Sequence, residues 1–240
     1  MAQPGTRSSV LGLVLLLVLL VAGGRALWLW LDRPIERVSI RGDLEYVSAD
    51  YLREKLAPMV RDLRWLSVDL DELREQARGI DWLSEVSVSR RWPNALTFRL
   101  FEQQPVARWN DDLLLNTRGK PFRRGEVTVS GDLPDLAGPE GSGPEVLALL
   151  DRLRPRLAEL GLEVTQLRLE DRGAWRFQVN DSVWVMLGRN QREPRLARFM
   201  AAWKRELGSR ASRIRYIDLR YPNGVAVAWH GETEAQIFDS

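Results

Sequence analysis

The order of apolar and polar positions divides the chain into an apolar run near the N-terminus and two later stretches where short periodic segments alternate with turns. Val10–Leu31 is apolar throughout apart from one charged residue, Arg25. A helix rises about 1.5 Å per residue, so this run reaches about 33 Å, enough to cross a hydrocarbon core of about 30 Å. Arg25 lies near the C-terminal end, where its side chain reaches the headgroups beside Trp28 and Trp30. The run therefore predicts one transmembrane helix.

A second interpretation of the same run stays open, namely a cleaved secretory signal. In that case Arg7 is its charged start, Val10–Val21 its apolar core and Ala22–Gly24 its small-residue exit. Both interpretations export the rest of the chain, provided that the N-terminus stays in the cytoplasm. The flanking charges do not decide the orientation, because Arg7 precedes the run while Arg33 and Arg37 follow it.

The first stretch after the apolar run, residues 35–104, predicts the element order β-α-α-β-β. Val38 and Ile40 alternate with polar residues as in a half-buried strand. Two helices follow, the first capped by Ser48 and the second by Asp69. We expect Pro58 to discourage continuation of the first helix. A β-hairpin then carries the alternating apolar residues Val86, Val88, Leu96, Phe98 and Leu100.

A three-stranded sheet covered by two helices has exposed edges. Unpaired N–H and C=O groups on an edge strand let a partner add a strand there. Charged residues such as Arg90, Arg91 and Arg99 alternatively serve only to protect these edges. The sequence leaves both interpretations open.

The second stretch, residues 105–232, predicts a mainly antiparallel β domain with flanking helices. Helices begin near Pro144 and Pro194, and Pro155 is expected to kink or restart the first of them. Residues 129–145 are rich in Gly and Pro and are interpreted as a connector, since their glycines match no phosphate-binding motif. Short strands are predicted in VARW, in LLLN and over residues 162–169, 175–179 and 183–187.

The chain closes with a predicted hairpin in YIDLRYPNGVAVAW. Its strands run through Tyr221 and from Val225 to Trp229, with a tight turn between them. Ala226 and Ala228 face one side of the last strand, so nothing bulky guards that side at a sheet edge. The alternative, an ordinary terminal strand, stays open.

Composition restricts the chemistry. The 240 residues contain 45% hydrophobic and 28% charged residues, as is typical of folded domains. A formal charge of +2 provides no strong field for nucleic acid. With no cysteine and one histidine, His230, the chain has no disulfide, thiolate site or multi-histidine metal site. No phosphate loop or nucleophile elbow is present, so we expect no cofactor and no enzymatic activity, a cell-wall glycosidase with a carboxylate pair being the open alternative.

Four segments carry a family resemblance: VSVSRRWPNALTFRLFEQQPVARW, LPDLAGPEGS, LGRNQREPRLARFM and YIDLRYPNGVAVAW. In this order, after one membrane helix, they resemble the FtsQ/DivIB family of bacterial cell-division proteins, and the first is typical of a POTRA domain. The resemblance implies an α+β fold with a cytoplasmic N-terminus over residues 1–9, a transmembrane helix over 10–31, a POTRA domain over 35–104, a β domain over 105–232 and a tail over 233–240.

The same resemblance implies a function. It predicts a single-pass type II protein of the bacterial inner membrane, with its bulk in the periplasm, acting at the division septum as a non-enzymatic scaffold. The β domain is expected to bind FtsB and FtsL, and the POTRA domain and membrane helix to contact other division proteins. The alternative is a POTRA-bearing envelope export or assembly component, which would be expected to carry a membrane β-barrel or repeated POTRA units.

Partner-binding residues are implied by motif. The resemblance places them at Arg172, Arg220, Tyr221, Asn223, Gly224 and Trp229. Arginine donates bidentate hydrogen bonds to a carboxylate, tyrosine and tryptophan provide large anchors, and a terminal strand pairs backbone to backbone. Arg172, in EDRGAW, is expected across the sheet from the last hairpin.

Overall fold

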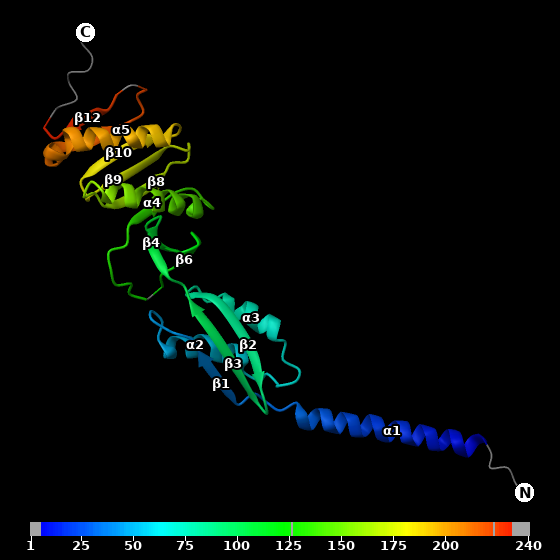
Figure 1. Ribbon diagram of the computed structural model, residues 1–240. Coiled ribbons are helices and arrows are strands. Elements are labelled where there is room, and N and C mark those ends of the chain that lie inside the picture. Colours follow the sequence, from blue (N-terminus) through cyan, green and yellow to red (C-terminus); the bar gives the residue numbers. More distant parts are fainter. Residues whose placement is uncertain (1–5, 126, 223, 232–240) are drawn as a thin grey trace, which may run out of the picture. The chain divides into compact units, whose positions relative to one another are not determined.

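The computed structural model describes residues 6–125, 127–222 and 224–231. The chain forms two compact units, Met1–Gln103 and Gln104–Ser240, each of which is described by itself (Figure 1). The fold is α+β.

The first unit begins with helix α1, Thr6–Leu31. Within it, Val10–Leu31 is strongly apolar, and no residue of its most apolar 18-residue window is buried. It is the one helix in the described part of the chain that is long and apolar enough to cross a membrane. The predicted apolar N-terminal helix is confirmed.

A β-α-α-β-β arrangement follows α1, as predicted (Figure 1). Its elements are β1 Arg37–Arg41, α2 Ala49–Val60, α3 Leu70–Arg78, β2 Leu83–Arg91 and β3 Ala95–Glu102. The sheet order is β1-β3-β2, with β1 parallel and β2 antiparallel to β3. Both edge strands, β1 and β2, therefore pair with β3 alone among the described residues.

The local signals for the two helices act as expected at their N-termini. The Ser48 hydroxyl accepts a hydrogen bond from the Tyr51 backbone N–H (3.1 Å), and the Asp69 carboxylate caps α3. Pro58 does not end α2, which continues to Val60, because only one intrahelical hydrogen bond is lost in the last turn. Apolar side chains between the helices and the sheet are fully buried, among them Leu52, Leu56, Trp82, Leu96, Phe98 and Leu100.

The second unit contains a nine-stranded sheet in the order β12-β11-β10-β9-β8-β7-β4-β5-β6. Five of its eight neighbouring pairs are antiparallel, which confirms a mainly antiparallel domain. The strands are β4 Pro105–Trp109, β5 Leu113–Asn116, β6 Pro121–Arg123, β7 Asp135–Ala137, β8 Val164–Leu169, β9 Trp175–Val179, β10 Val183–Gly188, β11 Ile214–Asp218 and β12 Ala226–Trp229. The helices are α4 Gly143–Ala158, α5 Arg192–Arg205 and a 3₁₀ helix, η1, Leu207–Arg213.

The structure differs from two expectations for the segment between β6 and β8. The Gly/Pro-rich connector contains β7, which pairs in parallel with both β4 and β8 and so joins the two halves of the sheet. Buried Leu136 explains why so short a segment is a strand, since its side chain joins the core. Helix α4 also passes through Pro155 without interruption, close to its C-terminal end.

Both long helices cover the same face of the large sheet. Their apolar residues and alternate strand residues form one hydrophobic cluster, in which Phe177 and Phe199 meet edge to face at 5.9 Å. On each strand, the residues between these core-facing residues point to the opposite face of the sheet. This alternation places Val225, Val227 and Trp229 on the helix side of the sheet.

Candidate functional site

The last strand, β12, lies at an edge of the large sheet. Among the described residues it pairs only with β11, with Ala226 opposite Asp218 and Ala228 opposite Tyr216. Ala226 is exposed and Ala228 half-buried, so one side of the strand presents only methyl groups beyond its backbone. An additional strand can approach such an edge without displacing a large side chain.

One hydrogen bond fixes which backbone groups of β12 face the free edge. The N–H of His230, directly after β12, donates to the Arg213 carbonyl at 2.8 Å, on the β11 side. Backbone groups alternate in direction along an antiparallel strand, so the N–H groups of Trp229 and Val227 point away from β11. These donors are therefore available to a partner strand.

The connection from β11 to β12 differs from the predicted tight hairpin. We expected a strand that continued to Tyr221, but β11 ends at Asp218 and β12 begins at Ala226. The Asp218 carboxylate accepts a hydrogen bond from the Arg220 N–H (2.9 Å), which turns the chain just after the strand. The result is a longer loop. Asn223, predicted as part of the site, lies outside the described residues.

Two arginines of α5 hold this loop by its carbonyl groups. Arg195 donates to the carbonyl of Arg220 at 3.1 Å. Arg198 donates to the carbonyls of Tyr221 at 3.0 Å and of Leu219 at 3.3 Å. Charge-assisted hydrogen bonds of this kind fix backbone that makes no sheet ladder. Sequence reasoning missed both arginines as part of the site, although a spacing of three on a helix already places them on one face.

Arg220 forms a bidentate ion pair with Asp218. Its Nη2 donates to Asp218 Oδ2 at 2.6 Å and its Nε to Asp218 Oδ1 at 3.0 Å, so these nitrogens face the protein rather than a partner. Burial acts to raise the pKa of Asp218, but hydrogen bonds from Arg220 and the charges of Arg220 and Arg195 outweigh it, and the pKa lies below its ordinary value. The pair thus positions the exposed Arg220 side chain at the start of the loop.

Two further predicted residues are accessible in the same loop. The Tyr221 side chain is 59% exposed and lies outside the hydrophobic cluster. Gly224 is half-buried, and a Cβ added there would meet no atom within 4 Å. A partner can therefore approach both the tyrosine ring and the backbone that leads into β12.

Trp229 lies at the other end of β12. It stands opposite Ile214, the first residue of β11, whereas Asp218 is the last. Strands rise about 3.3 Å per residue, so the two ends are about 13 Å apart. Trp229 packs on the core, and the Arg213 guanidinium lies 6.0 Å from its ring centre. The predicted residues therefore form a strip along an edge strand rather than one cluster.

Arg172 lies in the turn between β8 and β9 rather than on a strand. Trp175, which follows this turn, pairs with Gly188 at the end of β10. A Cβ added to Gly188 would lie 3.0 Å from Arg220 Cγ, so Arg220 crosses over that glycine. Arg172 and Arg220 thus occupy the same end of the sheet, separated by strands. Arg172 is exposed and makes no ion pair with any described residue.

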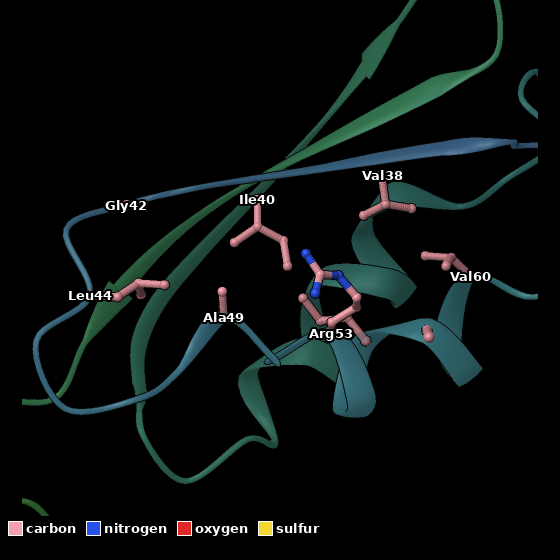
Figure 2. A pocket seen from close by; sticks show the side chains of 9 residues that line it. Val38, Ile40, Gly42, Leu44, Ala49, Arg53 and Val60 are labelled. Carbon is pink, nitrogen blue, oxygen red and sulfur yellow. The ribbon is translucent and has the colours of Figure 1, made fainter. Parts of the chain in front are cut away.

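The first unit contains an apolar pocket of about 260 Å³ between β1 and α2 (Figure 2). Val38 and Ile40 line it from the edge strand, and Arg53 extends from α2 toward them (Figure 2). The pocket borders backbone of β1 that pairs only with β3 in the described structure. Among the described residues there is no group of three or more His, Cys, Asp or Glu placed to hold a metal ion.

These features define a class: an apolar N-terminal helix, one POTRA-type unit and a second, sheet-rich unit whose last strand is an edge. Residues 33–103 match the family model described as POTRA domain, FtsQ-type, and residues 107–220 match the one described as Cell division protein FtsQ/DivIB, C-terminal. The chain belongs to the FtsQ/DivIB family of cell division proteins.

Curated relatives agree with this assignment. The chain is 36% identical to the cell division protein FtsQ of Vibrio cholerae serotype O1, over 91% of this chain and 86% of the relative. It is 33% identical to FtsQ of Hahella chejuensis, over 91% of this chain and 77% of the relative. It is 31% identical to FtsQ of Allochromatium vinosum, over 97% of this chain and 94% of the relative. Family membership supports a scaffold role in division, and the apolar helix is consistent with a single membrane span.

Proposed function

We propose that the chain is a non-enzymatic scaffold of the division machinery that docks FtsB, together with FtsL, along β12. Helix α1 crosses the inner membrane with its N-terminus in the cytoplasm, and the POTRA domain and the second unit work in the periplasm at the septum. The docked complex couples early to late division proteins. The observation that carries the proposal is the free edge of β12, with its small outer side chains and its outward N–H groups.

The strip along β12 suits an extended segment. Backbone hydrogen bonds to β12 supply affinity that does not depend on the side chains of the partner segment. The side chains at the two ends of the strip supply specificity. At one end, Tyr221 offers an exposed ring beside Arg220. At the other end, Trp229 gives a second aromatic surface. Arg172 adds a cation that no described acidic residue neutralises, so an acidic residue of the partner is favoured at that end of the sheet.

The backbone pairing is tested by removing one outward donor. In full-length protein co-expressed with FtsB and FtsL, Val227→Pro deletes an N–H that makes no bond to β11, and proline is tolerated on an edge strand at such a position. We expect co-purification of FtsB to fall sharply. Val227→Ala is the matched control, because it keeps the N–H and shortens the same side chain, and it should retain FtsB.

Two outcomes of this experiment decide the matter. Loss of FtsB from Val227→Pro with an unchanged melting temperature supports docking by strand addition. Full recovery of FtsB by Val227→Pro would show that β12 is not the docking edge. Arg172→Glu should also weaken capture, whereas Arg154→Glu, at an exposed position of α4, should not.

We further infer that the POTRA unit contacts other division proteins through the pocket beside β1. The pocket is apolar and adjoins unpaired strand backbone, a combination that binds an extended segment with alternating apolar residues. Ala57→Trp fills the pocket and should abolish septal recruitment of a fluorescent fusion while FtsB capture persists. Ala148→Trp, on the exposed side of α4, is the control. Normal recruitment of Ala57→Trp would exclude this pocket.

A further inference from the structure

The turn between β2 and β3 displays a tryptophan to solvent. Trp92 is 70% exposed, more than any other described large hydrophobic residue outside α1. The indole of Trp92 therefore buries little of its apolar surface against the protein. Tryptophan is the side chain that gains most at a boundary between apolar and polar surroundings, because its ring is apolar and its N–H is a hydrogen-bond donor. The proposed docking strip and the POTRA pocket do not include Trp92.

This turn is fastened to the segment that follows α1. The N–H of Trp65 donates to the carbonyl of Arg33 at 2.8 Å, and the Trp65 indole donates to the carbonyl of Arg91 at 3.2 Å. The N–H of Glu36 donates to the carbonyl of Asn94 at 3.1 Å. Trp65 therefore links the start of the turn, through its indole, to Arg33, through its backbone N–H, and Arg33 is the second residue after the apolar helix. These hydrogen bonds connect the β2–β3 turn to the segment that follows α1, so the turn lies at the end of the POTRA sheet that joins α1.

Two arginines flank the same end of the sheet, next to the exposed Glu36, whose carboxylate accepts a hydrogen bond from the Asn94 amide at 2.7 Å. Arg91 and Arg37 stand on either side of Ala95 in the strand register, on the face that carries no helix. A shallow depression of about 420 Å³ continues this face, and no acidic residue lines it. Its lining residues are Arg41, Ser87, Ser89, Arg90, Arg91, Thr97 and Arg99. Arginine and serine or threonine side chains in this arrangement favour phosphate groups.

We propose that the β2–β3 turn is a second membrane contact, with Trp92 in the interfacial layer and Arg91 and Arg37 facing anionic phospholipid headgroups. Tryptophan is enriched in the interfacial layer of membranes. At the end of α1, the exposed Trp28 and Trp30 are two tryptophans suited to the same layer. Basic residues near a membrane are attracted to anionic lipid. Because α1 already holds the domain at the membrane, the contact is intramolecular and forms at high effective concentration. The POTRA sheet then rests on the membrane by its turn.

The test uses full-length protein in nanodiscs made of brominated phosphatidylglycerol, whose bromine quenches indole fluorescence at the interface. Trp92→Phe should lower the fluorescence lost to brominated lipid by roughly one third, since it removes one of three interfacial indoles. Trp184→Phe, a half-buried tryptophan of β10, is the matched control and should leave that loss unchanged. Quenching of Trp28 and Trp30 reports independently that α1 is inserted, so failure of the span is distinguished from failure of the turn contact.

The charged part is tested by lipid exchange. Quenching of Trp92 should decrease in brominated phosphatidylcholine, and Arg91→Glu should remove the difference between the two lipids. An unchanged signal on Trp92→Phe, with α1 still quenched, would overturn the proposal. Protection of Trp92 only after addition of division proteins would identify the turn as a protein contact and would equally overturn it.

Discussion

The carboxylate of Asp32 accepts two hydrogen bonds from Ser67, one from its backbone N–H at 3.2 Å and one from its hydroxyl at 3.1 Å. Asp32 directly follows α1, and its own N–H still bonds to the Trp28 carbonyl in the last helical turn. Leu66 N–H and Arg64 Nε donate to the same carboxylate at 2.8 and 3.1 Å. The residue that directly follows the apolar helix is thus also built into the POTRA unit.

Removal of this carboxylate should loosen the POTRA unit. Asp32→Ala leaves buried donors of the loop unpaired, and we expect the melting temperature of the full-length protein to fall by several degrees. Asp50→Ala is the control, because the Asp50 side chain is 89% exposed in its pair with Arg53 and should contribute almost nothing. Equal melting of Asp32→Ala and wild type would contradict the role given to Asp32.

Acid should destabilise the folded chain through the same group. Burial acts to raise the pKa of Asp32, but hydrogen bonds from Leu66, Ser67 and Arg64 outweigh it and hold the pKa below its ordinary value. The pKa of an aspartate in an unfolded chain is about 3.9, so in acid the unfolded state binds more protons than the folded state does. The stabilisation is complete above that pH and is lost as pH falls through the lower folded pKa. Thermal melts should show a steeper loss below about pH 4 for wild type than for Asp32→Asn.

Tyr221 and Trp229 should separate binding from stability. Tyr221→Ala removes an exposed ring, so it should change the free energy of unfolding by less than about 0.5 kcal/mol while weakening FtsB binding about tenfold or more. Trp229→Ala removes a side chain packed on the core, and should cost about 1–3 kcal/mol of stability as well as binding. Denaturant unfolding and FtsB titration on each variant make the comparison. Unimpaired binding by both would remove the aromatic ends from the docking strip.

Gly119 should be intolerant of any side chain. Its φ is +72°, and an added Cβ would lie 2.5 Å from the Pro144 backbone at the start of α4. Gly119→Ala should therefore cost more than about 2 kcal/mol in unfolding free energy. Gly161 has a similar φ of +69° with nothing within 4 Å, so Gly161→Ala should cost only about 1 kcal/mol. Similar losses of unfolding free energy at both sites would show that the positive φ alone, and not the contact with α4, determines the cost of a side chain at Gly119.

Local sequence signals identified most elements because those elements depend on local causes. Ser48 and Asp69 cap helices with their own side chains, and Asn180 and Asp181 take positive φ in the predicted turn between β9 and β10. β7 was missed because its three residues become a strand only between β4 and β8, which are distant in sequence. No periodicity can appear in so short a segment.

The site was predictable in its residue types but not in its geometry. The motif pointed to Arg220 and Tyr221, yet it did not show that Arg220 pairs with Asp218 or that β11 ends there. Both depend on contacts from α5, where Arg195 and Arg198 hold the loop carbonyls. Such long-range hydrogen bonds leave no local pattern in the sequence.

The short strand β7 gives the large sheet a mechanical seam. It is joined to β4 by two register pairs and to β8 by three, whereas β8 and β9 share five. In the proposed arrangement, tension between a partner docked at β12 and α1 in the membrane would cross this seam, because β4 follows β3 along the chain. Buried Leu136 is the β7 residue that belongs to the hydrophobic cluster there. Because the two register pairs between β4 and β7 are the fewest between neighbouring strands of the sheet, we expect the sheet to part first at β7 under load, and this seam would then limit the pull that the domain transmits.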